Sequence, residues 1–246
     1  MRPLSTDRPD KTESPYTVDA GHVQIEFEVF SYLSYHNTIG STDLRLHVWN
    51  VAPLNLKVGL LNNVDLQIVL DNYLHLRAED LNGGATVNEG GFGDVTTRLK
   101  INLWGNDDGP TALAMMPFLI LPANSFVRHD RAVQGGVIFP FRAQLPAGFS
   151  LGAMAEFDCL RNLTRDGYDA VFVNTLSLSH QLIGKLDGYV EFYSEVNTGI
   201  TDWIGTVDVG LTYLLTKDIQ LDTGVNLGVT PAAPDVQPFL GITFRF

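Results

Sequence analysis

The side chains needed for hydrolytic chemistry occur in this sequence, but their spacing keeps them apart. Ser177, Ser179 and His180 are close in the chain. In an extended strand, however, Ser179 and His180 point to opposite faces and cannot form a nucleophile–base pair. No Gly-x-Ser-x-Gly motif occurs,. Glu156 and Asp158 could resemble a catalytic carboxylate pair, but residues two apart in a strand are simply neighbours on one face. We therefore expect no enzymatic activity.

Metal, cofactor and nucleic-acid binding are also disfavoured. The six histidines do not have metal-ligand spacing, and Cys159 is the single cysteine, so neither an internal disulfide nor a Cys/His zinc cluster is expected,. The formal net charge is −12, and no cluster of Lys and Arg is present that could bind phosphates,. We expect no cofactor, no metal and no nucleic-acid partner.

The charged side chains alternate with apolar ones, which is typical of strands with one polar and one apolar face. If the apolar face meets lipid, the polar face lines a lumen, where its charges influence the passage of solutes. The residues expected to line this lumen and solute path are Glu26, Glu28, Asp65, Asp71, Asp94, Arg98, Lys100, Arg142, Glu156, Asp158, Glu191, Asp208 and Asp222. The alternative is a salt-bridged network that fills the lumen and holds the barrel closed.

Period-two alternation recurs along most of the chain, while helical spacing is almost absent. Leu221, Val225 and Leu227, for example, alternate with Asp222 and Asn226. Many of the segments exceed the five or six residues typical of soluble strands and suit a tilted membrane strand, which needs about 9–11 residues. We expect strands at residues 22–36, 43–60, 64–77, 93–104, 110–122, 133–145, 149–160, 168–182, 187–197, 202–215, 218–229 and 235–246.

These segments predict an all-β fold, a closed antiparallel up-and-down transmembrane β-barrel of about twelve strands. Charged residues are 18% of the chain, below the roughly 25% of soluble domains, as expected for a surface that meets lipid,. Short turns near residues 61–63, 105–109, 146–148, 183–186 and 216–217 mark the periplasmic side, where both termini lie. Longer connections near residues 37–42, 78–92, 123–132 and 161–167 mark the extracellular side.

The two ends of the chain differ in character. The last strand ends in Phe246, as in the terminal signal that the assembly machinery of outer-membrane barrels reads. Residues 1–20 are polar and lack alternation, so they form either a leader or a partial plug, and residues 21–246 form the barrel. We see no export signal and expect that one was removed. No apolar run is long enough for a transmembrane helix.

The strand at 110–122 differs from the others because both of its faces are apolar. Ala112, Met116 and Phe118 lie on one face, and Leu113 and Leu119 lie on the other. Since a water-filled lumen would not favour an apolar inner face, we expect either the chain itself or a substrate to cover it.

Three stretches carry a resemblance to a known family. They are Thr6–Asp10 with Thr12–Ser14, Gly91–Val95 with Arg98–Lys100, and the closing Gly241–Phe246. On these residues the chain resembles the outer-membrane transporters associated with the meta-pathway of phenol degradation, and the likeness spans nearly the whole chain. The resemblance implies a barrel through which small molecules pass, without identifying phenol as the substrate.

The sequence therefore predicts a bacterial outer-membrane barrel, monomeric and surrounded by lipid, that acts as a narrow passive channel for small solutes, including small hydrophobic or aromatic compounds. Two alternatives stay open: a structural or ligand-binding barrel with a plugged lumen, and a soluble β-barrel binder with an apolar core. If the lumen conducts, its surplus of acidic residues predicts a preference for cations.

Overall fold

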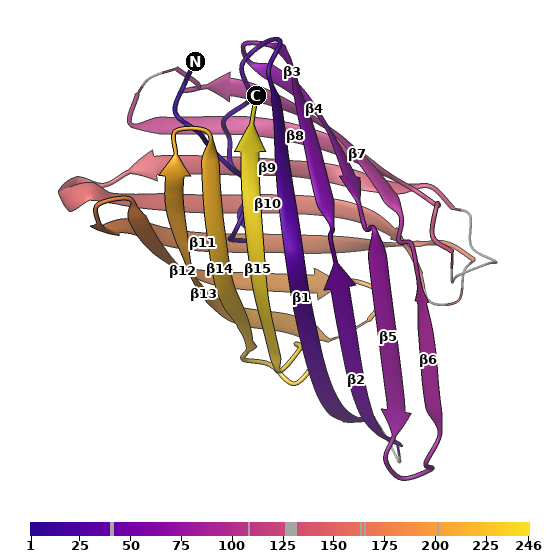
Figure 1. Ribbon diagram of the computed structural model, residues 1–246. Coiled ribbons are helices and arrows are strands. Elements are labelled where there is room, and N and C mark those ends of the chain that lie inside the picture. Colours follow the sequence, from indigo (N-terminus) through magenta and orange to yellow (C-terminus); the bar gives the residue numbers. More distant parts are fainter. Residues whose placement is uncertain (40–41, 108, 126–131, 163, 165, 201) are drawn as a thin grey trace.

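A computed structural model describes residues 1–39, 42–107, 109–125, 132–162, 164, 166–200 and 202–246, and its strands form one closed antiparallel sheet (Figure 1). The strands are β1 (Val23–Ile39), β2 (Thr42–Val51), β3 (Leu54–Leu61), β4 (Val64–Leu70), β5 (Tyr73–Asp80), β6 (Thr86–Gly91), β7 (Val95–Trp104), β8 (Thr111–Leu121), β9 (Gln134–Gln144), β10 (Phe149–Arg161), β11 (Tyr168–Ile183), β12 (Leu186–Asn197), β13 (Trp203–Thr216), β14 (Ile219–Gly228) and β15 (Val236–Arg245). Pairing of β15 with β1 closes the barrel.

The fifteen strands occupy twelve positions around the barrel, which confirms the predicted twelve-stranded barrel. At three of these positions two consecutive strands lie end to end: β2 and β3, β4 and β5, and β6 and β7. β1 pairs with both β2 and β3, so these two strands lie end to end along it. Among the described residues, no helix has the length and hydropathy needed to cross a bilayer.

The strand divisions correct two predictions and have a local cause. Residues 43–60 and 64–77 were each expected to be one strand, but the first is interrupted at Ala52 and Pro53 and the second at Asp71 and Asn72. Pro53 has no N–H for the ladder, and Ala52 has a left-handed φ of 62°,. Asn72 Nδ2 donates to the Ala52 carbonyl at 2.6 Å, which ties the two breaks together.

The expected loop at residues 78–92 is also wrong, because it contains the end of β5 and the whole of β6. The sequence of β6 is Thr-Val-Asn-Glu-Gly-Gly, which carries no apolar alternation. It is a strand because its backbone pairs with β5 in register from Leu74 opposite Gly91 to Glu79 opposite Thr86. A strand that is held mainly by backbone pairing need not show the alternation of apolar and polar residues from which strands are predicted.

In the body of the barrel the apolar side chains point outward and the polar ones inward, as expected. Leu221, Leu227 and Leu240 are 39–49% exposed, whereas Asp222 is 2% and Asn226 is 8% exposed. This arrangement is the reverse of a soluble barrel with an apolar core. It places an apolar surface where only lipid can cover it, so the soluble alternative does not fit.

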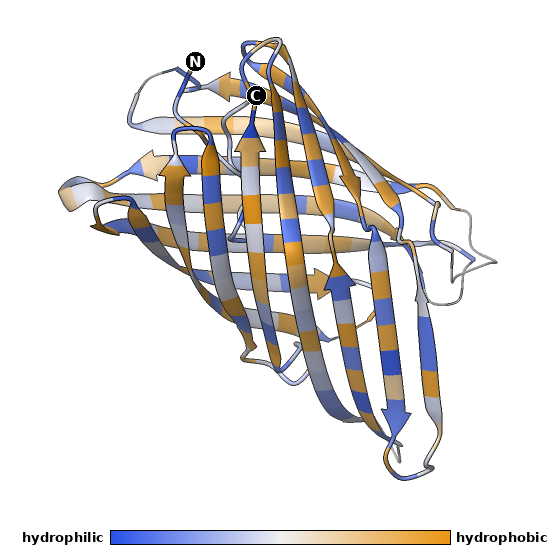
Figure 2. Cartoon of the chain, viewed as in Figure 1, coloured by the Kyte–Doolittle hydropathy of each residue, from blue (hydrophilic) through white to orange (hydrophobic). Residues whose placement is uncertain are grey.

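Beyond the strand breaks, β1, β2, β5 and β6 project from the barrel body as a sheet (Figure 1), and the alternation changes phase. A register shift between Glu28 and Phe30 of β1 turns Ser31 inward, where it is 1% exposed and pairs with Phe239. Leu33, two residues after Ser31, therefore lies on the inner face of this projection, and Tyr32 lies on the outer face. Figure 2 shows apolar and polar residues alternating along these strands.

The inner and outer faces of the projection each keep the same kind of side chain from β1 to β2 and β5. By register, the inner face carries leucine and valine side chains, and the outer face carries aromatic and histidine side chains. Tyr32 stacks on His47 with ring centroids 5.8 Å apart, and Trp49 lies 5.4 Å from His75. Such amphipathic rings suit the boundary between lipid and water.

Several exposed aromatic residues lie near the two ends of the barrel. Phe149, which contacts His180, lies at the end with the short turns, together with Tyr213 and Phe246. Phe157 and Phe172 pack edge to face at 5.1 Å near the opposite end of β10 and β11. Trp203, at the start of β13, lies at that same end.

Candidate functional site: the lumen and the N-terminal segment

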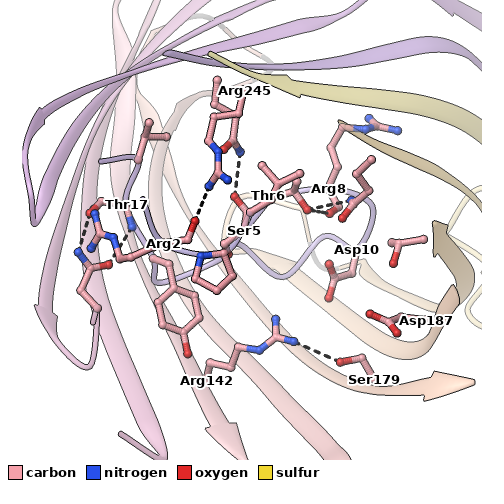
Figure 3. Close-up of a pocket in the computed structure, with 18 of the residues that line it drawn as sticks. Arg2, Ser5, Thr6, Arg8, Asp10, Thr17, Arg142, Ser179, Asp187 and Arg245 are labelled. Atoms are coloured by element: carbon pink, nitrogen blue, oxygen red, sulfur yellow. Dashed lines mark hydrogen bonds between the residues drawn. The ribbon is translucent and has the colours of Figure 1, made fainter. Parts of the chain in front are cut away.

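Residues 1–20, here called the N-terminal segment, lie inside the barrel (Figures 1 and 3). Their contacts reach strands on opposite sides of the wall. Thr12 donates from its backbone to Glu191 of β12 at 2.8 Å, while the backbone N–H of Val18 donates to Asp65 of β4 at 2.9 Å. The segment leaves the lumen beside β3, where the Gly21 N–H donates to the Gly59 carbonyl at 2.9 Å.

The most buried contacts of the N-terminal segment form a charged cluster around Asp7. Its carboxylate pairs with Lys100 at 2.5 Å and also with Lys57, while its backbone N–H donates to Glu26 at 3.0 Å. Lys57 pairs in turn with Glu26. Neither lysine is more than 2% exposed, so their charged groups have almost no contact with water. Breaking such a buried pair is costly because the remaining charge stays buried.

Further ion pairs fix the rest of the N-terminal segment across the lumen. Arg8 bridges Glu28 of β1 at 3.0 Å and Asp222 of β14 at 2.9 Å. Lys11 pairs with Asp208 of β13 at 3.0 Å, and Glu13 pairs with Arg98 of β7 at 2.5 Å. The N-terminal segment thus carries charges of both signs, and Arg8, Lys11 and Glu13 each face an opposite charge on the wall.

Eight of the predicted lumen residues are contacted directly by the N-terminal segment: Glu26, Glu28, Asp65, Arg98, Lys100, Glu191, Asp208 and Asp222. Arg142 instead donates to Ser150 and Ser179. Glu156 and Asp158 lie on β10, on the same face as Met154. Asp71 and Asp94 sit at the strand breaks, where Asp94 Oδ1 accepts from the backbone of Ala123 and Asn124 at 3.0 Å.

Sequence reasoning missed the residues of the N-terminal segment that hold it in place, chiefly Asp7, Arg8, Lys11 and Glu13. Alternation could not reveal them because the segment is not a strand. The available signal was electrostatic: the expected lumen residues had unbalanced charges, and the segment carries both acids and bases. Three or more His, Cys, Asp or Glu side chains arranged for a metal ion do not occur within the described part of the chain.

An apolar cluster lies on the inner side of β8–β11. It consists of Met116, Phe118, Ile138, Met154, Val171 and Val173. The inner face of β8 is therefore the one with Ala112 and Met116, both fully buried. Neighbouring wall strands cover it together with the N-terminal segment, whose Glu13 N–H lies 3.5 Å from Met154 Sδ. The chain itself thus provides the apolar cover that this strand requires.

A cavity of about 450 Å³ remains between the N-terminal segment and the wall, at the end of the barrel with the short turns (Figure 3). Four arginines line it, together with hydroxyl, amide and acidic groups. Arg2 pairs with Asp19 at 2.6 Å beside this cavity. Burial alone would raise the pKa of Asp19, but the backbone and side-chain hydrogen bonds from Arg2 lower it below its usual value.

A second hollow, of about 650 Å³, lies on the outer surface around β7, β8 and β9. Its lining combines outward residues such as Leu119 with inward residues such as Phe118 and Arg98. The β7–β8 ladder lacks pairing where Leu99 faces Pro117, and proline has no N–H to donate,. The wall is therefore weakly hydrogen-bonded next to this hollow.

Comparison with known proteins agrees with this architecture. A family model described as "Putative MetA-pathway of phenol degradation" matches residues 6–246. The crystal structure of an outer-membrane channel from Pseudomonas putida F1 superposes with a TM-score of 0.68 at 12% identity, covering 97% of this chain and 99% of that one. The NanC porin gives 0.54 at 11% identity, covering 90% and 98%.

The translocator domain of the autotransporter NalP from Neisseria meningitidis also superposes, with a TM-score of 0.54 at 10% identity, covering 93% of this chain and 90% of that one. A search of curated protein sequences gives no match. At these identities the structural likeness establishes the fold, which is that of outer-membrane β-barrels.

Proposed function

The chain belongs to the family whose description names the MetA pathway of phenol degradation. From this premise we propose that the protein is a narrow passive channel for small solutes, including small hydrophobic and aromatic compounds. The fold is that of outer-membrane barrels, and the apolar exterior requires a bilayer,. The observation that carries the proposal is the N-terminal segment, which narrows the lumen while leaving a cavity of about 450 Å³ beside it.

The polar character of the contacts supports a channel rather than a permanently filled barrel. The N-terminal segment is held by ion pairs and hydrogen bonds to several strands, and no disulfide ties its described residues to the wall. The segment also contacts apolar wall side chains, as where Arg8 lies over the Phe239 ring and Lys11 over the Tyr193 ring. A segment fixed in this way limits the size of solutes and can shift without unfolding the barrel.

Two features support small hydrophobic or aromatic solutes. The lumen contains the apolar cluster around Met116, and the inner face of the projection carries Leu33, Leu46 and Leu76. The outer hollow next to Pro117 brings lipid-facing and lumen-facing residues into one surface. Apolar surfaces on both sides of the wall can accept a solute that partitions into the bilayer.

The proposal is tested by comparing the full chain with a variant that lacks residues 2–19. In planar bilayers we expect the full chain to give small discrete conductance steps and the shortened variant to give larger ones. In liposome swelling, the full chain should admit single-ring solutes but exclude a trisaccharide. If the full chain neither conducts nor swells liposomes while the shortened variant does both, the plugged, ligand-binding alternative is correct.

A further inference from the structure

Arg142 of β9 differs from the other arginines that line the 450 Å³ cavity. Those three have carboxylate partners: Arg2 with Asp19, Arg8 with Asp222, and Arg245 with Asp218. Within the described ranges of the chain, Arg142 forms no ion pair with a carboxylate; its hydrogen bonds go to two serines. The cavity therefore contains one guanidinium whose charge is not neutralised by direct pairing.

Two neutral hydroxyls hold the Arg142 guanidinium in position. Nε donates to Ser150 Oγ at 2.7 Å and Nη2 donates to Ser179 Oγ at 3.3 Å. Nη1 has no hydrogen-bond partner among the residues that the structure describes. Figure 3 shows the side chain reaching into the cavity next to Ser179 and below Asp10. A guanidinium fixed in this way with donors to spare is suited to bind a carboxylate.

The rest of the cavity restricts the class of anion. Asp10 and Asp187 also line it, so an anion with two or more charges would be repelled,. Leu4 and Tyr16 give it apolar surface. Its volume lies within the range of about 300–1,000 Å³ that is typical of small-ligand sites. A ligand with one carboxylate and one ring matches this combination of charge, polarity and size.

We propose that this cavity is a binding subsite for small aromatic monocarboxylates, in which Arg142 holds the carboxylate and Ser179 orients the guanidinium. The inference deepens the proposed function and rests on it for its place in a solute path. Asp10 belongs to the N-terminal segment and Arg142 to the wall, so a bound carboxylate lies at the junction of the two.

The test is equilibrium binding to the full chain in detergent, with benzoate as the probe and calorimetry as the readout. We expect saturable binding of benzoate, and at least tenfold weaker binding of phenol and benzylamine, which keep the ring but lack the carboxylate. Arg142→Gln should raise the dissociation constant of benzoate by about tenfold or more, since a charge-assisted hydrogen bond is lost. Asp10→Asn should lower it, because a competing negative charge is removed.

Arg45→Gln is the matched control, because Arg45 lies on the exposed outer face of the projection; it should bind benzoate like the unaltered chain. Arg142→Lys keeps the charge but not the planar fork, so it tests the site if Arg142→Gln does not fold, and it should bind more weakly. Unchanged affinity in a folded Arg142 variant, or no saturable binding to the unaltered chain, overturns the subsite.

The two proposals fail separately. Benzoate binding without conductance keeps the subsite and removes the channel. Conductance without benzoate binding keeps the channel and removes the subsite.

Discussion

Lys100 of the barrel wall and Asp7 of the N-terminal segment lie 93 residues apart in sequence, yet their charged groups meet at 2.5 Å inside the lumen. Asp7 pairs at the same time with Lys57, which also pairs with Glu26, so one carboxylate contacts two wall lysines that are almost without exposed surface. Asp7 is therefore the most buried of the several charged side chains that anchor the N-terminal segment.

Replacing Asp7 should therefore loosen the N-terminal segment more than any other single change in it. Asp7→Asn leaves Lys57 and Lys100 buried without their shared partner, which costs about 3–5 kcal/mol of unfolding free energy. We expect a lower unfolding temperature in detergent and larger conductance steps in planar bilayers.

Asp107→Asn is the control for Asp7→Asn, because the Asp107 side chain is 81% exposed and lies 3.4 Å from Arg2. An exposed pair of this kind contributes about 0–1 kcal/mol. Equal conductance and stability in the two variants would contradict the anchoring role of Asp7.

Gly59 of β3 should tolerate no side chain, because the N-terminal segment passes directly over it. A Cβ at this position would lie 2.0 Å from the backbone oxygen of Asp19. Gly59→Ala should displace the exit of the segment, lower stability by about 1–3 kcal/mol and increase conductance. Gly188→Ala is the control, since its Cβ would meet the flexible end of Leu182 at 3.0 Å. A Gly59→Ala variant that matches this control in both measurements would exclude the close approach.

The body of the barrel could be predicted from sequence because each wall residue faces either lipid or lumen. The alternation of Leu221 and Asp222 follows directly from that choice. The strand breaks at Pro53 and Asn72 could not be predicted in the same way, since apolar and polar residues still alternate on each side of them. β6 was missed because its pairing uses the backbone alone.

The contacts that fill the lumen were beyond sequence reasoning for a different reason. Glu26, Lys57 and Lys100 come from three strands, and a period within one strand says which face a residue occupies, not what it meets across the lumen. The predicted lumen residues therefore identified one side of most of the ion pairs between the wall and the N-terminal segment. The other side came from a segment whose path no local pattern defines.

Phe246 should matter more for assembly in the cell than for stability. It is 69% exposed, and its backbone pairs with Val23 at 2.8 and 3.1 Å across the seam that closes the barrel. Deleting Phe246 should sharply lower the amount of folded barrel in membranes, measured by its altered gel mobility without heating. Refolding of the same variant into detergent should remain efficient. Normal assembly of the variant in cells would rule out a signal at this residue.

The turn between β13 and β14 should respond to acid. The side-chain hydrogen bond from Arg245, with Nη2 2.8 Å from Oδ1, lowers the pKa of Asp218 in the folded protein. A carboxyl with a lowered folded pKa contributes stability above its unfolded pKa of about 3.9, and this is lost as the pH falls through the folded pKa. The unfolding temperatures of the unaltered chain and Asp218→Asn should thus differ at neutral pH and converge in strong acid. A constant difference would contradict this pair.

The lumen should prefer cations, and the structure indicates where that preference originates. Lys100 pairs with Asp7 and Arg98 pairs with Glu13 of the N-terminal segment, so neither wall cation is left without an acidic partner. Arg142 is a cation in the described lumen without a carboxylate partner, near the short-turn end.

Against this one positive charge, the inner face of β10 carries Glu156 and Asp158. A narrow pore with walls of low dielectric concentrates ions of the sign opposite to its net fixed charge. Reversal potentials across a potassium chloride gradient should therefore show cation preference, and Arg142→Gln should increase it by removing the opposing charge. Glu156→Gln should reduce it. A clear anion preference of the unaltered chain would mean that Arg142 lies at the narrowest point and determines selectivity, and the Arg142→Gln variant would then lose that preference.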